Sequence, residues 1–304
     1  MPVITPEPER SRAGAILAAL FAVVVWGASF IATKIAVGEV APITVVWLRF
    51  GMGVAVMGIV VLSRRQLSLP AAGDLAYFAL LGFLGIAFHQ WLQSNGLVTS
   101  QASTTSWIVA STPIFMALLG WMVLGEGVLP LAALGIGVAA AGVLVVATRG
   151  QLSSLAAGRL GAPGDWLILA SAPNWAIFSV LSRRGLKRYP SAGMMFWVMT
   201  FGWLLSGFLF LADPGISDVS RLTTRGWMAV AFLGVFCSGL AYVFWYDALS
   251  RLPSSQVGTF LYIEPLVTVA IAAAMLGERL TVPTLAGGVA ILVGVWMVSF
   301  RRAA

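Results

Sequence analysis

The amino-acid sequence predicts an all-α membrane protein in which ten transmembrane helices form two inverted five-helix repeats around a central cavity. Three observations predict this fold class: an apolar composition, ten apolar stretches, and an internal repeat. Hydrophobic residues make up 60% of the 304 residues and charged residues only 10%, against about 45–50% and about 25% in soluble domains. A soluble protein of this composition would lack a polar surface, so we expect the chain to lie in a lipid bilayer.

Ten mostly apolar stretches are long enough to cross a bilayer. Backbone polar groups in lipid must be satisfied within the segment, which favours helices over open strands. The first stretch is too long for a signal peptide and lacks a cleavage pattern, so we expect it to be a retained helix. The predicted spans are residues 13–37, 44–62, 74–98, 102–124, 130–148, 164–183, 192–212, 225–249, 256–276 and 283–300.

The two halves of the chain repeat each other. Residues 94–126 align without a gap with residues 246–278, and the two copies share a central proline (Pro113 and Pro265) and a closing Leu-Gly-Glu. Five spans per half is an odd number, so the second half must enter the membrane from the opposite face. This is the inverted-repeat architecture of secondary transporters.

The repeat and the loops give the expected domains and orientation. Eleven Lys and Arg residues lie on the side of the N-terminus and six on the other side. Cytoplasmic loops carry an excess of these residues, so both termini are expected in the cytoplasm. The expected domains are a cytoplasmic tail at 1–12, a first repeat at 13–150, a linker at 151–163, and a second repeat at 164–304 that ends in a short cytoplasmic C-terminus.

Span three carries a polar face, because His89 and Gln93 are four residues apart. Exposing these side chains to lipid would cost free energy, so they face protein or a water-filled cavity. Interhelical hydrogen bonding and a cavity-lining role both remain open. A lone histidine is also a candidate for a proton-sensitive element.

Two central prolines mark spans four and nine. Glu264 stands directly before Pro265, and an acid at this depth is a functional candidate by default. A proline frees a carbonyl one turn back, so a broken helix at either position would suit a substrate contact or a hinge. Ser111 lies just before the other proline, Pro113. The alternative is a structural kink, with Glu264 protonated or hydrogen-bonded to a neighbour.

Aromatic residues recur near the middle of spans. Trp26 and Trp175 lie 149 residues apart at matching repeat positions, and Asn174 directly precedes the second. We expect Pro173 to break that span. With Tyr242 in span eight, these side chains predict apolar walls with few polar anchors, which suit an amphipathic organic solute better than a bare ion.

Other polar and small residues have structural interpretations. Arg49 lies about six residues into span two, where it can snorkel to the interface, so we expect a structural role. Glu126 and Glu278 are either solvated loop acids or gate partners of nearby arginines. The small residues of spans five and ten indicate close packing that buttresses the fold or forms a dimer face; they are Gly135, Gly137, Ala141, Gly142, Gly287, Gly288 and Gly294.

The composition also argues against several classes of protein. One cysteine and one histidine leave no basis for an internal disulfide, a zinc site or a haem site. No GxxxxGK[ST] loop is present, as an ATP-driven pump would need, and no acid–histidine–cysteine cluster suggests an enzyme. The basic residues lie mostly in short loops, so the net charge of +7 does not predict nucleic-acid binding. No cofactor or metal is expected, and the expected partners are the lipid bilayer and a small-molecule substrate.

Four motifs resemble the EamA family of the drug/metabolite transporter superfamily. They are WGASFIATK from Trp26, WLRF in span two, the proline and Gly-Glu pair of span four, and EPLVTVAIAAAMLGE in span nine. The resemblance implies ten helices in two inverted halves, both termini in the cytoplasm, and a bacterial inner-membrane exporter of small metabolites, commonly amino acids. The chain is similar to the YddG-type aromatic amino acid exporters. Some members of that branch carry Trp where this chain has Thr112, which leaves a wider range of neutral amino acids open.

The first hypothesis is therefore a secondary transporter that exports amino acids by alternating access. The alternatives are an exporter of drugs, nucleosides or other metabolites, and a membrane sensor that transports nothing. The sequence leaves proton coupling and oligomeric state open. The predicted substrate-binding residues are Trp26, His89, Gln93, Ser111, Asn174, Trp175, Tyr242 and Glu264, and the predicted gating or hinge residues are Pro113 and Pro265.

Overall fold

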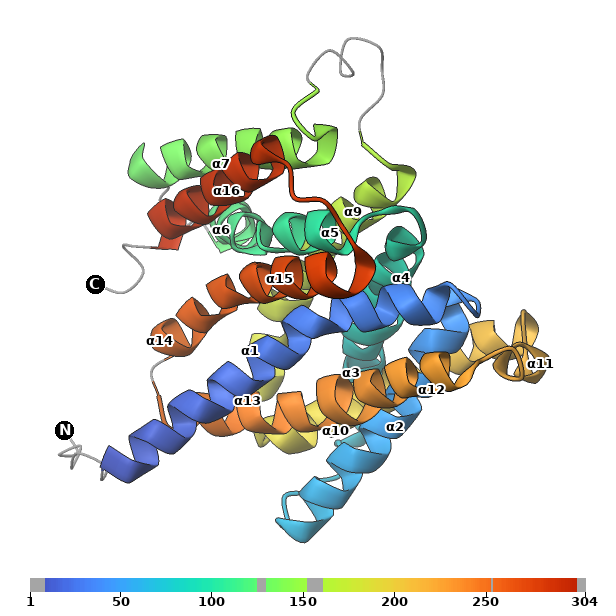
Figure 1. Cartoon of the computed structure of the whole chain (residues 1–304). Helices are drawn as coiled ribbons and strands as arrows, with labels where there is room; N and C mark the ends of the chain where they lie inside the picture. The colour runs from blue at the N-terminus through green and yellow to red at the C-terminus, as the bar shows by residue number, and fades with distance from the viewer. Residues whose placement is uncertain (1–8, 125–129, 152–160, 253, 300–304) are drawn as a thin grey trace, which may run out of the picture.

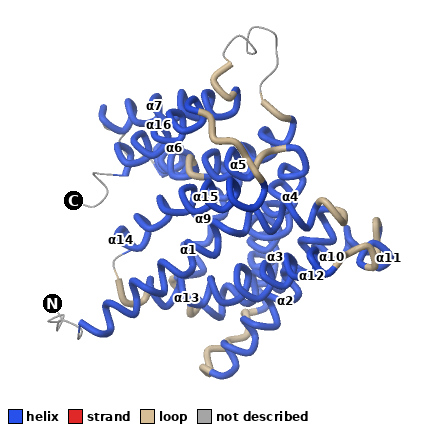
Figure 2. Tube along the Cα trace, viewed as in Figure 1, coloured by secondary structure: helices blue, strands red, loops and turns tan. Residues whose placement is uncertain are grey.

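The computed structural model describes residues 9–124, 130–151, 161–252 and 254–299. Within these residues every regular element is helical, as Figure 2 shows. The first half contains α1 (Glu9–Val37), α2 (Pro42–Ser63), η1 (Ala72–Asp74), α3 (Leu75–Gly82), η2 (Phe83–Phe88), α4 (His89–Thr99), α5 (Ala102–Val109), α6 (Thr112–Leu124) and α7 (Pro130–Thr148). Glu126 lies outside the described residues.

The second half of the chain is also helical. It contains α9 (Pro163–Leu186), α10 (Ser191–Ala212), α11 (Ile216–Val219), α12 (Thr224–Ala231), η3 (Phe232–Leu240), α13 (Ala241–Leu249), α14 (Ser254–Thr259), η4 (Phe260–Ile263), α15 (Glu264–Leu276) and α16 (Val282–Ser299). The start of α1 and the end of α16 lie on the same side of the bundle (left in Figure 1).

Eight helical segments in the described part of the chain are long and apolar enough to cross a membrane. The chain is therefore a multi-pass membrane protein. The two other predicted spans also lie on helices, but α9 carries Asp165, Arg183 and Arg184, and the apolar part of α16 is shorter.

Four of the described membrane helices are irregular near their middle. The segments η2 and η3 are π-helical, and both begin with Phe-Leu-Gly. The helix of Pro113 is interrupted at Ala110 and Ser111, and that of Pro265 passes through the 3-10 segment η4. The break expected at Pro173 is wrong: α9 continues through this residue. A buried membrane helix tolerates a proline when neighbouring groups satisfy the freed carbonyl.

The long helices pack around α1 and α2. Helix α1 contacts α13 on one side and α15 on the other, and Figure 1 shows it between them. A hydrophobic core joins α2, α3, α9, α10 and α13; its fully enclosed side chains include Phe50, Phe78, Ile86 and Val198. This core lies beside the predicted site residues.

Helices α7 and α16 lie side by side at the edge of the bundle (Figure 1). A Cβ atom on Gly142 would lie 2.6 Å from the carbonyl oxygen of Gly287, and one on Gly135 equally close to the carbonyl oxygen of Gly294. The small residues thus allow the two backbones to touch. The close packing predicted for these spans is present within this chain.

Asp218, in the short helix α11, anchors the start of α2 on the side of the bundle away from the chain ends. Asp218 accepts hydrogen bonds from the Ala41 amide (2.8 Å), the Thr44 hydroxyl (2.6 Å) and Arg221 (3.0 Å). Burial alone would raise the pKa of the Asp218 carboxyl, but these hydrogen bonds and the Arg221 charge hold that pKa below its ordinary value. The ionised form therefore stabilises the folded protein.

Gly142→Ala should lower the melting temperature of the purified protein by several degrees. The added methyl meets backbone, and overpacking of this kind costs about 1–3 kcal/mol, more than the gain of up to about 1 kcal/mol in helix propensity. Gly137→Ala is the control, because nothing lies within 4 Å of its Cβ position. Equal melting temperatures for the two variants in detergent would contradict the packing described here.

Asp218→Asn should lower the melting temperature most at neutral pH. The folded pKa of Asp218 is depressed, so its contribution is complete above the unfolded pKa of about 3.9 and is lost as the pH falls through the folded pKa. The difference between wild type and variant should shrink below about pH 4. Melting curves in detergent from pH 7 to pH 3 measure this, and a constant difference would contradict it.

Candidate functional site

One aromatic group joins α1 to α13. The Trp26 ring lies edge-on to Tyr242, with centroids 5.4 Å apart, and is tilted against Trp245 at 5.2 Å. The Trp26 indole N–H donates to the carbonyl of Cys237 at 3.1 Å. Cys237 belongs to the π-helical segment η3, where the rearranged backbone ladder presents its carbonyl to a side chain. The irregular backbone therefore fixes the orientation of the Trp26 ring.

A second aromatic group joins α4 to α9. The rings of His89 and Trp175 have centroids 4.7 Å apart, and Phe178 follows at 4.9 Å from Trp175. The Asn174 amide donates to the Leu84 carbonyl in the other π-helical segment, η2, at 2.8 Å. The Asn174 amide N–H thus links α9 to η2.

His89 is 6% exposed, and its Nδ1 has no hydrogen-bond partner in the described part of the chain. A buried polar atom without a partner costs free energy, and such atoms gather at functional sites. Trp26 and Trp175 keep part of their surface accessible and pack against the same hydrophobic core, which includes Tyr242. The two aromatic groups therefore border the same hydrophobic core.

Arg49 does not snorkel to the interface as expected. Its side chain is inside the bundle, where Nε donates to the Ser238 hydroxyl and Nη1 to the Gln90 amide oxygen, both at 3.1 Å. The guanidinium also lies over the Phe50 ring, 5.1 Å from its centroid. The position of Arg49 along its helix suggested a shallow residue. Instead, α2 directs this side chain toward polar partners on η3 and α4, and their hydrogen bonds stabilise it inside the bundle.

Glu264 begins α15 where this helix crosses α1. Its backbone carbonyl would lie 2.8 Å from a Cβ atom on Gly27 and accepts a hydrogen bond from Thr268 at 2.9 Å. Its carboxyl keeps accessible surface and has no hydrogen bond or ion pair to another described residue. Glu264 and Arg49 both lie within electrostatic reach of Tyr242.

These contacts define an interior site. Ring contacts and electrostatic interactions connect its members in a continuous series across six membrane helices. The site consists of Trp26, Arg49, His89, Trp175, Tyr242 and Glu264.

Two predicted residues have other surroundings. Gln93 is half-buried on α4, one turn from His89, and donates to no described residue. Ser111 is buried at the interruption between α5 and α6, where its hydroxyl donates to the Ile108 carbonyl at 2.6 Å. Within the described residues, no ring contact, hydrogen bond or ion pair joins Ser111 to the interior site.

Sequence reasoning missed the polar partners supplied by the π-helical segments. Ser238 and Cys237 lie in η3 and bond to Arg49 and Trp26, and the Trp245 ring packs at a tilt against Trp26. The Phe-Leu-Gly that opens both η2 and η3 was the available signal. An arginine inside an apolar span is likewise a functional candidate by default, which could have identified Arg49.

Glu278 is neither a solvated loop acid nor the partner of an arginine. Its carboxylate accepts from the amides of Ala102 and Ser103 at 2.8 and 3.0 Å, and from the Ser103 hydroxyl at 2.6 Å. It therefore caps α5 from the other half of the chain. Lys34 donates to the Leu97 carbonyl at 3.2 Å and to that of Ser100 on the same side of the bundle.

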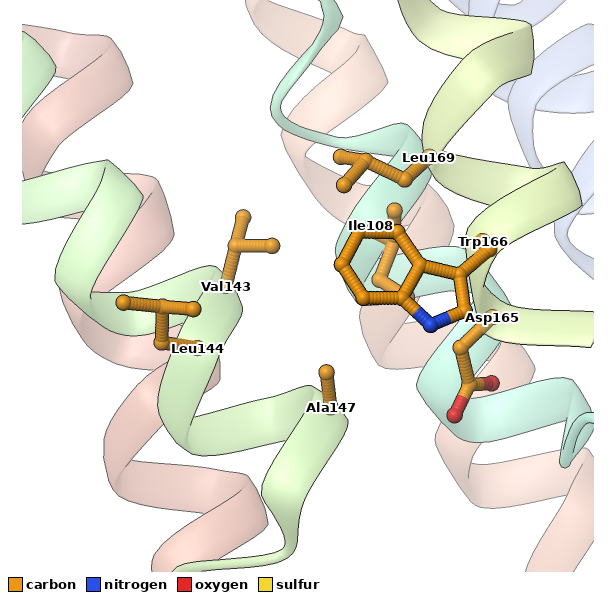
Figure 3. Close-up of a pocket in the computed structure, with 7 residues that line it drawn as sticks. All are labelled: Ile108, Val143, Leu144, Ala147, Asp165, Trp166 and Leu169. Atoms are coloured by element: carbon orange, nitrogen blue, oxygen red, sulfur yellow. The ribbon is translucent and has the colours of Figure 1, made fainter. Parts of the chain in front are cut away.

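A small apolar pocket lies between α7, α5 and α9, away from the interior site (Figure 3). The Trp166 ring lies on its α9 side, facing Val143 and Ala147 of α7 (Figure 3). The Asp165 carboxylate at its margin bonds to the Ala162 amide and the Ser100 hydroxyl. None of the predicted site residues lines this pocket.

The family model of EamA-like transporters matches residues 13–148 and 162–300. An uncharacterized transporter of Archaeoglobus fulgidus is 26% identical and covers 91% of this chain and 94% of its own length. A probable terminal-alkyne amino-acid exporter of Streptantibioticus cattleyicolor is 26% identical, with 94% of each chain covered. A probable amino-acid metabolite efflux pump of Salmonella typhimurium is 28% identical, with 92% of each covered.

A solved crystal structure shares the fold. It superposes with a TM-score of 0.67 and covers 96% of this chain and 99% of its own, at 22% sequence identity.

Gly27→Ala should lower the stability and the transport activity of the protein together. The added methyl would lie 2.8 Å from the Glu264 carbonyl and 2.9 Å from the Val267 Cβ, so α15 must move away from α1 and carry Glu264 with it. Gly14→Ala, on the same helix, has nothing within 4 Å and should behave as wild type. Melting temperature and substrate flux measure the effect; a Gly27→Ala protein equal to Gly14→Ala would exclude this close contact.

Proposed function

The chain belongs to the EamA-like transporter family, and from that membership we propose that it is a secondary transporter that exports amino acids, aromatic and other neutral ones, or related small metabolites. Export would take place across the bacterial inner membrane by alternating access. Two relatives named as amino-acid exporters or efflux pumps support the choice of cargo. The observation that carries the proposal is the interior site, which combines aromatic walls with two opposite charges.

The walls of the interior site suit the side chain of a neutral amino acid. Trp26, Trp175 and Tyr242 offer large rings, and the first two keep part of their surface accessible. Ligand sites are mostly apolar and hold a few polar groups that fix orientation. In the proposal, His89 supplies a hydrogen-bonding group in this site, and Gln93 lies one turn along the same helix.

Glu264 suits the amino group of such a substrate. Its carboxyl has accessible surface and no cationic partner within the described residues. An intramembrane acid without a partner marks a substrate or ion pathway by default. The same carboxyl is the proposed proton carrier if transport proves to be coupled to a proton gradient. Pro265 and Pro113, at the two interrupted helices, are the proposed hinges.

The proposed architecture is ten membrane helices in two inverted repeats, 13–150 and 164–304, joined by the linker 151–163. The paired π-helical segments, the paired interruptions before Pro113 and Pro265, and the 149-residue spacing of Trp26 and Trp175 support it. Such repeats place a site between them and allow each half to open in turn. The distribution of Lys and Arg supports cytoplasmic termini.

Trp175→Ala and His89→Ala should each reduce amino acid flux in proteoliposomes at least about tenfold, because loss of a buried aromatic contact or a polar anchor costs about 1.4 kcal/mol or more of substrate binding. Trp166→Ala is the matched control on the same helix, since Trp166 is 49% exposed and lies away from the site. All three proteins should remain folded by size-exclusion chromatography. Unchanged flux in the first two variants would refute the site assignment.

A further inference from the structure

Arg49 is a buried cation without a buried anion beside it. The side chain is 5% exposed, and both of its hydrogen-bonded partners, Gln90 and Ser238, are neutral. The ion pairs in the described part of the chain involve Arg64, Arg188 and Arg221. Arginine keeps its charge in proteins, so this charge is not removed by loss of a proton.

The guanidinium retains unused hydrogen-bonding capacity. It has five N–H donors, of which Nε–H and one Nη1–H bond to described residues. Nη2 donates to no described residue, yet it is not among the fully enclosed polar atoms that lack a partner. Nη2 therefore keeps some surface that water can reach, although the side chain as a whole is 5% exposed. The planar fork of an arginine matches the two oxygens of a carboxylate.

The surroundings of Arg49 specify which anion fits. Tyr242 is within electrostatic reach of Arg49 and of Glu264, and its ring lies edge-on to Trp26. His89 is within electrostatic reach of Arg49 and packs on Trp175. A cation and an acid, each without a charged partner, thus flank one aromatic interior. A free inorganic anion would use only the cation; a zwitterion with an apolar side chain would use the whole arrangement.

We infer that Arg49 recognises the carboxylate of the transported amino acid, while Glu264 faces its ammonium group. This inference deepens the proposed function and rests on it. Gln90 and Ser238 act as positioning residues, because they hold the guanidinium at Nε and Nη1 and leave Nη2 for the substrate. The fixed orientation lowers the cost of ordering a long side chain on binding.

The test is a competition assay in wild-type proteoliposomes that take up labelled L-phenylalanine or L-leucine. Unlabelled L-phenylalanine, L-phenylalaninamide and 3-phenylpropionate compete; the amide lacks the carboxylate and the acid lacks the ammonium group. Wild type should favour phenylalanine over the amide at least about tenfold, since a hydrogen bond to a charged group is lost. Arg49→Gln should reduce that preference to within about twofold, and Arg49→Lys should keep part of it.

Two further variants separate recognition from a general structural effect. In Glu264→Gln, the preference for phenylalanine over the amide should remain. The preference for phenylalanine over 3-phenylpropionate should be lost. Arg64→Gln, at the end of the same helix and bonded to Asp247, should change neither preference. If Arg49→Gln does not fold, the wild-type competition and Arg49→Lys still decide the question.

The outcomes are distinct. Loss of the preference for phenylalanine over phenylalaninamide in Arg49→Gln supports the inference. A wild type that accepts the amide as well as the amino acid, or an Arg49→Gln protein that keeps the preference, overturns it while amino acid transport stands. Absence of saturable uptake of any amino acid by the wild type overturns the proposed function, and the inference with it.

Discussion

The hydrogen-bonding demand of the backbone in hydrocarbon is the constraint on which the rest of this structure depends. Every N–H and C=O group at membrane depth must be satisfied by protein, so regular helices fill most of the bundle. In the part of the membrane helices that the structure describes, the departures from regular helix near mid-span are the π-helical segments η2 and η3 and the interruptions before Pro113 and Pro265. At these places side chains such as Trp26 and Asn174 take over freed carbonyls.

The irregular segments also bring polar chemistry into the interior. Segment η3 supplies Ser238 to Arg49, and η2 leads directly into His89 and Gln90. A buried charge is costly without a partner. Arg49 is buried without a charged partner, and Glu264 also has no charged partner among the described residues. We propose that a bound zwitterionic substrate supplies the opposite charge that each of these two groups lacks. The aromatic rings around them would then provide the apolar part of recognition, and a substrate lacking either charge would leave one group unmatched.

The sequence predicted the helical membrane class and the family, because composition and four motifs carry that information. It also predicted that Trp26, His89, Trp175 and Tyr242 face the interior, since polar and aromatic residues at mid-span avoid lipid.

The sequence did not predict which way each helix turns its side chains or where the backbone is irregular, because hydrophobic periodicity encodes neither property. Arg49 therefore looked superficial when counted from the helix end, although its helix directs it inward. Pro173 looked like a break, although α9 continues through it. The Glu278 carboxylate accepts hydrogen bonds from backbone amides at the start of α5, and sequence spacing does not predict this contact.

The most direct test of the central claim is the flux of a panel of radiolabelled amino acids in proteoliposomes of the wild-type protein, with and without a pH gradient. The proposed exporter predicts saturable flux of neutral amino acids, with aromatic ones among those that move. A response to the gradient would assign proton coupling to the site of Glu264, and flux without such a response would describe facilitated transport. No saturable flux of any amino acid would contradict the account and favour another class of metabolite as cargo.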